Sequence, residues 1–152
     1  MYKKVWYMRG EKPGGVFFWS NKKLTVFGAL TSENRFFSNF YDSQNSLTYL
    51  AFLSEFVESL DKKKKYVFIF DNAGYHKTNV IRNYLARFDF IKVQYLPPYS
   101  PELNPIEACW KITRAAVTNS KFYKTIESLQ GSLEDFWEKH KFMLNFTNYL
   151  CR

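Results

Sequence analysis

The spacing of apolar and polar positions predicts strands and then a helix in the first 60 residues. Gly and Pro interrupt residues 1–15, which predicts a loop. Short apolar runs follow at Val16–Trp19, Leu24–Leu30 and Arg35–Tyr41, and each has the length of a strand. From Leu47 to Leu60 the apolar residues recur at intervals of three and four, which is typical of one face of an α-helix.

A run of five apolar residues, Tyr66–Phe70, indicates a buried strand that ends at Asp71. A strand that is apolar on both faces is typical of the middle of a sheet that helices cover. Thr78 can cap the helix that follows, and Ile91–Leu96 is the next short strand. This order predicts an α/β or α+β fold in which part of the sheet is parallel.

Four of the five prolines fall within Leu96–Pro105, which predicts a stiff, non-repetitive loop because each proline fixes its own φ and restricts the preceding residue. The Asn-Pro pair at the end of this loop is typical of a helix N-cap and first helical position, and we expect that helix to run through Val117. Thr125–His140 is a last amphipathic helix, and Phe142–Cys151 is an aromatic tail.

Length and composition favour one globular domain over residues 1–152, with 46% apolar residues and no internal repeat. The net charge of +8 favours a polyanionic partner, with DNA or RNA ahead of an anionic membrane. The run Lys62–Lys65 is interpreted as a solvated helix end in preference to a DNA-binding patch. Two cysteines without zinc spacing, and no apolar run long enough for a membrane span, predict a soluble, cytoplasmic protein without a disulfide framework.

Asp71 is a candidate site residue because it directly follows a buried strand, and ligands of open α/β sheets bind at that edge. The same position suits an ordinary turn, since Asn72 and Gly74 follow it and all three residues are common in turns. Taken alone, Asp71 therefore leaves both interpretations open.

Glu107 is the second candidate, in the first turn of the helix after the proline-rich loop. Asn104-x-x-Glu107 also has the spacing of a capping box, which is the stronger interpretation for Glu107 alone. If the strands Tyr66–Phe70 and Ile91–Leu96 are parallel neighbours, however, Asp71 and Glu107 project from the same sheet edge. Two carboxylates there would suit hard divalent cations, and a pair of such ions can promote phosphodiester cleavage.

Longer blocks of sequence surround these carboxylates, namely Asp71-Asn-Ala-Gly-Tyr-His76 and Leu96-Pro-Pro-Tyr-Ser-Pro-Glu-Leu-Asn-Pro-Ile-Glu-Ala-Cys-Trp110. Together they closely resemble the mariner-like DDE transposases, and most closely the bacterial and archaeal insertion-sequence branch. Lys23–Leu30, and Trp6 with Arg9-Gly10, resemble weaker upstream blocks of the same branch, so the resemblance covers nearly the whole chain.

The resemblance implies an RNase H-like mixed sheet flanked by helices, dependence on Mg²⁺ or Mn²⁺, and DNA cleavage at transposon ends followed by strand transfer. It also implies that the protein acts at the nucleoid. Matched by motif, Asp71 is the second and Glu107 the third catalytic carboxylate, and both would be metal ligands.

Other residues of the two blocks have less specific interpretations. His76 is either a buried structural histidine or, with Asn72, a group that positions metal or phosphate. Lys77, Lys111 and Arg114 flank the blocks and are candidates for DNA-phosphate contacts, although each could be an ordinary exposed charge. We expect Trp110 in the core and Glu102 to be a loop residue that binds no metal.

The sequence departs from the family at its N-terminus. The family's first catalytic Asp lies on a strand upstream of the Trp–Arg–Gly region, and here Trp6 is already near the start. We therefore expect that strand, its Asp and the family's upstream helix-turn-helix domain to be absent. Because the missing strand is central, its backbone partners would be left unpaired. We predict that Val5–Met8, Val16–Trp19 or a strand of another chain fills the gap.

Two functional hypotheses follow. The first is a transposase catalytic domain or fragment, for which an upstream reading frame supplies the missing Asp. The second is an inactive remnant that binds DNA, forms a homodimer or pairs with a full-length transposase. A different RNase H-like nuclease is a third reading, which the proline-rich block disfavours.

Overall fold

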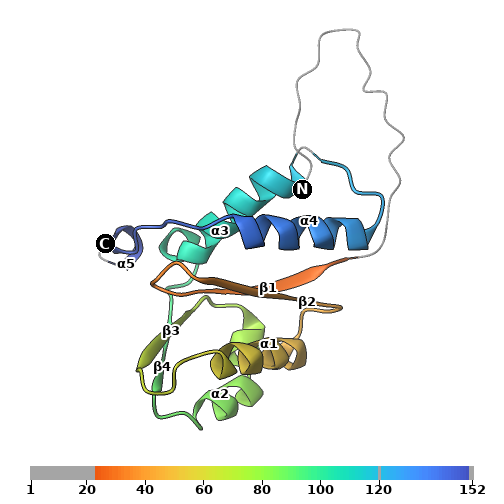
Figure 1. Ribbon diagram of the computed structural model, residues 1–152. Helices are drawn as coiled ribbons and strands as arrows, with labels where there is room; N and C mark the ends of the chain where they lie inside the picture. The colour runs from red at the N-terminus through yellow and green to blue at the C-terminus, as the bar shows by residue number, and fades with distance from the viewer. Residues whose placement is uncertain (1–22, 120, 151–152) are drawn as a thin grey trace, which may run out of the picture.

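The computed structural model describes residues 23–119 and 121–150, in which helices pack around two short, separate sheets (Figure 1). The first sheet is the antiparallel pair β1 (Thr25–Leu30) and β2 (Phe36–Tyr41), with Gly28 opposite Ser38. The second is the parallel pair β3 (Tyr66–Phe70) and β4 (Ile91–Tyr95). These bounds confirm the four predicted strands of the described region, whereas Val16–Trp19 and Val5–Met8 lie outside it.

The helices also follow the predicted order. They are α1 (Ser46–Glu58), α2 (Asn79–Leu85), α3 (Pro105–Thr113), α4 (Ile126–Lys139) and α5 (Thr147–Leu150), with 3₁₀ turns η1 (Gly74–Lys77) and η2 (Pro101–Leu103) and a π-helical turn η3 (Arg114–Thr118). The predicted helix through Val117 therefore changes at Thr113 to the π-helical turn. None of these helices is long and apolar enough to cross a membrane.

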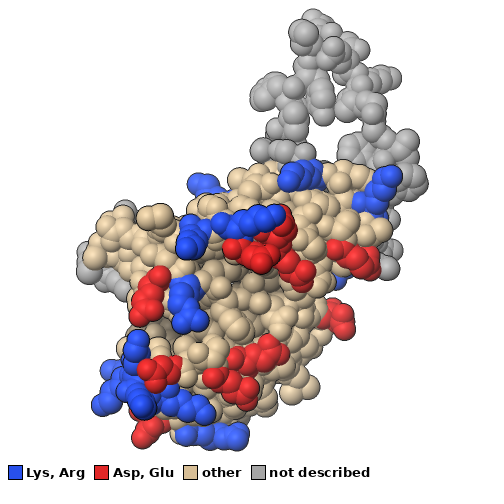
Figure 2. All heavy atoms as spheres, in the orientation of Figure 1, with Lys and Arg blue, Asp and Glu red and all other residues tan. Residues whose placement is uncertain are grey.

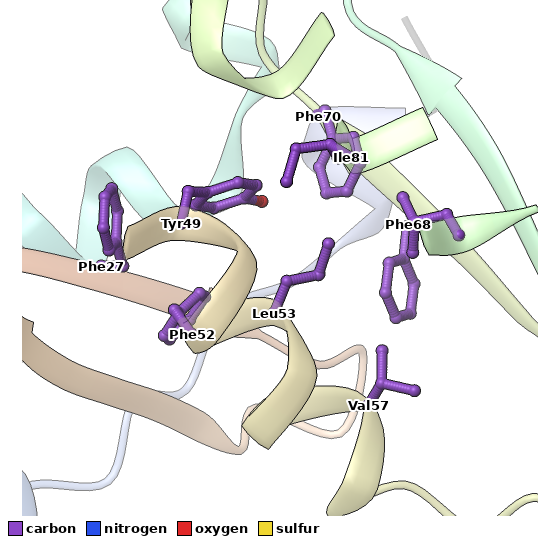
Figure 3. Close-up of a cluster of buried hydrophobic side chains, with 9 residues drawn as sticks. Phe27, Tyr49, Phe52, Leu53, Val57, Phe68, Phe70 and Ile81 are labelled. Atoms are coloured by element: carbon purple, nitrogen blue, oxygen red, sulfur yellow. The ribbon is translucent and has the colours of Figure 1, made fainter. Parts of the chain in front are cut away.

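Helix α1 begins at a capping box, because the Asn45 side chain accepts from the backbone N–H groups of Leu47 and Thr48 at 2.9 and 3.0 Å while the Thr48 hydroxyl caps Asn45 in return. Its buried face carries Phe52 and Leu53, each 1% exposed. Figure 3 shows these side chains among residues of β1, β3 and α2, so α1 is the common wall of both sheets.

The other face of the β1–β2 hairpin is covered by α3, α4 and the chain after α4 (Figure 1). The ring of Phe36 lies 5.3 Å from Trp110, 5.4 Å from Trp137 and 5.0 Å from Phe142, measured between ring centroids. Aromatic rings often pack in such offset and edge-on arrangements. Trp110 is half-buried in this aromatic cluster and does not belong to the buried core around α1.

Among the described residues β3 pairs only with β4, and the exposure of its side chains alternates. The placement of β3 in the middle of a larger sheet stays a prediction. Phe68 and Phe70 are 7% and 8% exposed on the side of α1, whereas Val67 is 61% exposed on the opposite side. An apolar run alone does not show whether other elements of the protein pack on both faces of the strand.

Candidate active site

The two sequence blocks meet at the C-terminal edge of the parallel sheet. The Leu96 N–H donates to the carbonyl of Phe70 at 2.8 Å and extends the β3–β4 ladder by one residue. Directly after it, the Asn72 side-chain amide donates to the carbonyl of Leu96 at 2.6 Å. Asn72 therefore holds the loop after β3 against the start of the proline-rich loop, which gives this residue a structural role.

Asp71 is held in a defined orientation while its carboxylate remains open to solvent. The Ala73 N–H donates to its Oδ1 at 2.9 Å, and Nδ1 of His76 lies 2.8 Å from the same oxygen. The interaction with His76 is the largest cause that holds the pKa of Asp71 below its usual value; burial opposes it, and Lys77 adds a smaller lowering. With a side chain that is 46% exposed, Asp71 presents an ionised carboxylate that a solvated cation can approach.

His76 lies beneath this carboxylate and is only 8% exposed. The rings of Tyr49 and Tyr75 lie 4.4 Å from its imidazole, and Phe70 lies 5.1 Å away. Nδ1 is buried and makes no hydrogen bond of standard geometry with the described residues, although it lies close to Asp71. The packing of the ring agrees with the interpretation of His76 as a buried structural histidine, and a role in positioning metal or phosphate stays a prediction.

Glu107 is free for chemistry because the expected capping box is not formed. Asn104 is the N-cap residue of α3, but its side chain makes no capping hydrogen bond, and only its carbonyl accepts from the Glu107 N–H at 3.1 Å. The Glu107 side chain is exposed and has no hydrogen bond or ion pair with another residue of the described region. A capping role therefore does not explain the glutamate at this position.

Asp71 and Glu107 line the same groove, whose volume is about 810 Å³ and which runs between β1 and β3. His76 contributes to its wall, and Asn104 and Trp110 lie on the α3 side. Within the described region, however, no group of three or more His, Cys, Asp or Glu residues could hold a metal ion. Both predicted carboxylates therefore line one groove, and no third metal ligand is found beside them among the described residues.

The three candidate cations differ in how closely they approach this edge. The Lys77 ammonium contacts the side-chain oxygen of Asn72 and lies 5.4 Å from the centre of the Tyr95 ring. Lys111 and Arg114 are exposed, four and seven residues after Glu107, and this spacing places them on the Glu107 side of the helix.

The lysine run before β3 has a different position. Lys62–Lys65 are exposed and precede the N-terminal end of the strand, opposite to the end that Asp71 follows. Figure 2 shows Lys and Arg side chains gathered over this end of the molecule, with acidic groups interspersed elsewhere on the same face. The run is solvated, as interpreted, but it is not a helix end, because α1 ends at Glu58 and the lysines lie in the turn that follows.

Sequence reasoning missed two features near the site. Tyr99, in the proline-rich loop, has a φ of 57° and a fully exposed ring, although non-glycine residues rarely adopt positive φ. Gly28 on β1 faces the Trp110 ring so closely that a Cβ atom would lie 2.7 Å from Cζ2. Neither could be found by periodicity, since one is a local backbone conformation and the other a long-range contact. Glu102 is exposed in η2 and does not line the groove.

Comparison with known proteins places this arrangement in a family. The Tc3 transposase of Caenorhabditis elegans is 34% identical over 123 residues, which cover 76% of this chain and 36% of the relative. A 39 kDa protein of the insertion element IS630 from Shigella sonnei is 25% identical over 88% of this chain and 39% of its own length. The chain thus spans well under half of each of these two relatives.

Solved structures of Mos1 transposase have the same fold. The strand transfer complex superposes with a TM-score of 0.69 at 18% identity, over 97% of this chain and 44% of the Mos1 chain. This likeness confirms the expected RNase H-like fold. A model of the DDE superfamily endonucleases matches residues 1–130, and the chain belongs to that family.

Proposed function

We propose that this chain is the DNA-cutting domain of a transposase, with Asp71 and Glu107 as its metal-binding carboxylates. The observation that carries the proposal is that both carboxylates line one groove while neither is neutralised by a Lys or Arg ion pair within the described region. The names of the relatives support it, since one is a transposase and another an insertion-element protein.

The chemistry of the two side chains fits a divalent cation. Carboxylate oxygens are hard ligands, and Mg²⁺ is commonly held by only one or two carboxylates together with water and substrate phosphates. We propose Mg²⁺ or Mn²⁺, in line with the use of divalent ions in this superfamily. When bound, such an ion supplies Lewis-acid activation of a phosphodiester and of the attacking water.

The surrounding residues would orient these groups and bind DNA. His76 and the Ala73 N–H hold the Asp71 carboxylate in one orientation, and Asn72 holds the loop that carries it. Lys77, Lys111 and Arg114 are placed to contact phosphates, and the exposed ring of Tyr99 could stack on an unpaired base.

The proposed partners are the transposon ends and target DNA. The similar Mos1 structures are a strand transfer complex and a paired-end complex with the left transposon end. By analogy we propose that this chain acts as a pair, either with a second copy or with a longer transposase.

The test is Mn²⁺-dependent nicking of supercoiled DNA by the purified chain and its variants. We expect Asp71→Ala and Glu107→Ala each to lower nicking by more than about 100-fold, because losing a direct metal ligand should exceed the 10–100-fold typical of an outer-shell group. His76→Gln should fall within that smaller range. Glu102→Ala is the matched control, an exposed acidic residue of the same block that should leave nicking unchanged.

Nicking that survives in both carboxylate variants would show that another site or a contaminant cuts the DNA. No nicking by the unaltered chain, with DNA binding that is retained at about 50 mM salt and lost at higher salt, would favour the inactive DNA-binding remnant.

A further inference from the structure

The proline-rich loop carries one aromatic side chain out into solvent beside the candidate active site. The ring of Tyr99 is fully exposed and makes no hydrogen bond, ring contact or ion pair with another residue of the described region. It is the most exposed large apolar side chain of that region. Single exposed apolar residues are common on proteins, so the exposure of Tyr99 becomes informative only together with its backbone conformation and its position.

The backbone of Tyr99 is held in a conformation that a tyrosine seldom adopts. Its φ of 57° lies in the left-handed region, which is unfavourable for a bulky side chain. Three prolines lie within two positions of Tyr99, and each fixes its own φ. The Ser100 hydroxyl donates to the Pro98 carbonyl at 3.2 Å and so bridges Tyr99. Strained residues that their surroundings enforce in this way are frequent at binding and active sites.

The loop is short, which keeps Tyr99 near the two candidate carboxylates. Leu96 donates to the carbonyl of Phe70, the residue before Asp71, and it lies three positions before Tyr99. Three extended residues span at most about 11 Å, so the Tyr99 backbone lies within that distance of the Leu96 end of the sheet. Glu107 follows Tyr99 by eight positions, in the first turn of α3. A DNA strand with one phosphate at these carboxylates would therefore bring its neighbouring bases close to the ring.

We propose that Tyr99 is a stacking platform for an unpaired base next to the phosphodiester that the chain cuts. This role rests on the proposed function, because the carboxylates fix where the DNA lies. Every base has an aromatic face, so an exposed ring can bind an unpaired base without reading its identity. The net charge of +8 favours a nucleic acid over a protein as the partner that covers the ring. Tyr99 thus makes the chain prefer DNA with an unpaired end to an intact duplex.

The test is binding of the purified full chain to two DNA probes, with Ca²⁺ in place of Mn²⁺ so that binding is measured without cutting. One probe is a blunt duplex. The other is the same duplex with a short single-stranded tail that contains 2-aminopurine, whose fluorescence falls when it stacks. We expect the tailed probe to bind more tightly and to be quenched. Tyr99→Ala should weaken its binding by about 5- to 150-fold and abolish the quenching, while binding of the blunt duplex stays unchanged.

Two further variants separate the ring from the backbone. Tyr99→Phe keeps an aromatic ring and should bind both probes as the unaltered chain does. Tyr99→Gly removes the ring and suits a positive φ, so it should lose the tailed probe to the same degree as Tyr99→Ala. Phe122→Ala is the matched control: it removes another exposed aromatic ring, outside the proline-rich loop, and should leave the binding of both probes unchanged.

Other outcomes would overturn the proposal. Equal binding of both probes, unchanged in Tyr99→Ala, would leave the proposed DNA-cutting function standing and remove this role of Tyr99. Binding of neither probe would count against the proposed function itself, and against the stacking role with it. Normal binding of the tailed probe by Tyr99→Gly would mean that the loop conformation matters and the ring does not. Self-association of the chain that Tyr99→Ala abolishes, with binding of the tailed probe unchanged, would assign the ring to a contact between two copies.

Discussion

The two sheets of the molecule differ in how completely they are packed. The β1–β2 hairpin has α1 on one face and the aromatic residues of α3 and α4 on the other (Figure 1). The β3–β4 pair has α1 and α2 on one face, while Val67 on the other is 61% exposed and the outer edge of β3 opens into the groove. Both candidate carboxylates line that groove.

This difference separates the residues that stabilise the fold from those that carry the proposed chemistry. Helix α1 connects the two regions, because the ring of Phe56 lies 5.5 Å from Phe37 on β2 and 5.7 Å from Phe68 on β3. The two sheets should therefore unfold together even though they share no strand pairing. Asp71 and Glu107, at the poorly covered edge, contribute little to that core.

The largest expected effect tests whether α1 couples the two sheets. Phe52 is 1% exposed and contacts Phe27 and Phe37, so Phe52→Ala should lower the free energy of unfolding by about 3–5 kcal/mol. Denaturant titration followed by NMR signals of β1 and β4 should give one shared midpoint. Leu47→Ala on the same helix is the control: Leu47 is 68% exposed and should shift stability by no more than about 0.5 kcal/mol. Separate midpoints for the two sheets would show that they are independent.

A smaller effect is expected where β1 meets α3. A Cβ atom at Gly28 would lie 2.7 and 2.8 Å from two atoms of the Trp110 ring, so Gly28→Val should destabilise by about 1–3 kcal/mol through overpacking. Gly131 in α4 has open space around its Cβ position, and Gly131→Ala should instead stabilise by about 0.5–1 kcal/mol. Thermal unfolding of both variants measures the difference in sign. A neutral Gly28→Val would mean that the hairpin and α3 can move apart.

The sequence predicted the elements of both regions from local patterns. The four described strands and the helices from Ser46, Asn79, Pro105 and Ile126 follow apolar spacing, capping residues and proline positions, all of which act over a few residues. Asp71 and Glu107 were predicted as site residues because the order of elements along the chain places both at one sheet edge. Both line one groove, and their role in metal binding and catalysis stays a prediction.

The parts that the sequence did not predict depend on contacts between distant residues. Gly28 is a glycine because of Trp110, which follows it by 82 positions. The capping box expected at Asn104 is not formed, although the spacing is right and the same motif does form at Asn45 and Thr125. The exposure of Val67 depends on what covers the second face of β3, which no pattern within Tyr66–Phe70 specifies.

The smallest expected effect concerns Asp71 and His76 at the edge of the β3–β4 sheet. This effect on stability depends on pH, unlike the effects of substitutions in the apolar core. The interaction with His76 is the main cause of the lowered pKa of Asp71, so His76→Gln should raise that pKa toward the usual value near 3.9. A carboxylate whose pKa is lower in the folded than in the unfolded state stabilises the fold above the unfolded pKa, and this contribution is lost as pH falls through the folded pKa. The free energy of unfolding of His76→Gln should therefore fall below that of the unaltered protein mainly above about pH 4. In stronger acid the two should differ only by any packing change at the buried ring, which does not depend on pH. NMR titration of the Asp71 carboxyl carbon measures the shift directly.

Lys77→Gln should raise the same pKa by less, since Lys77 is the weakest of the lowering causes. An Asp71 pKa that is unchanged in His76→Gln would mean that the contacts from Ala73 and Lys77 lower this pKa without His76, and that His76 serves only to pack the core.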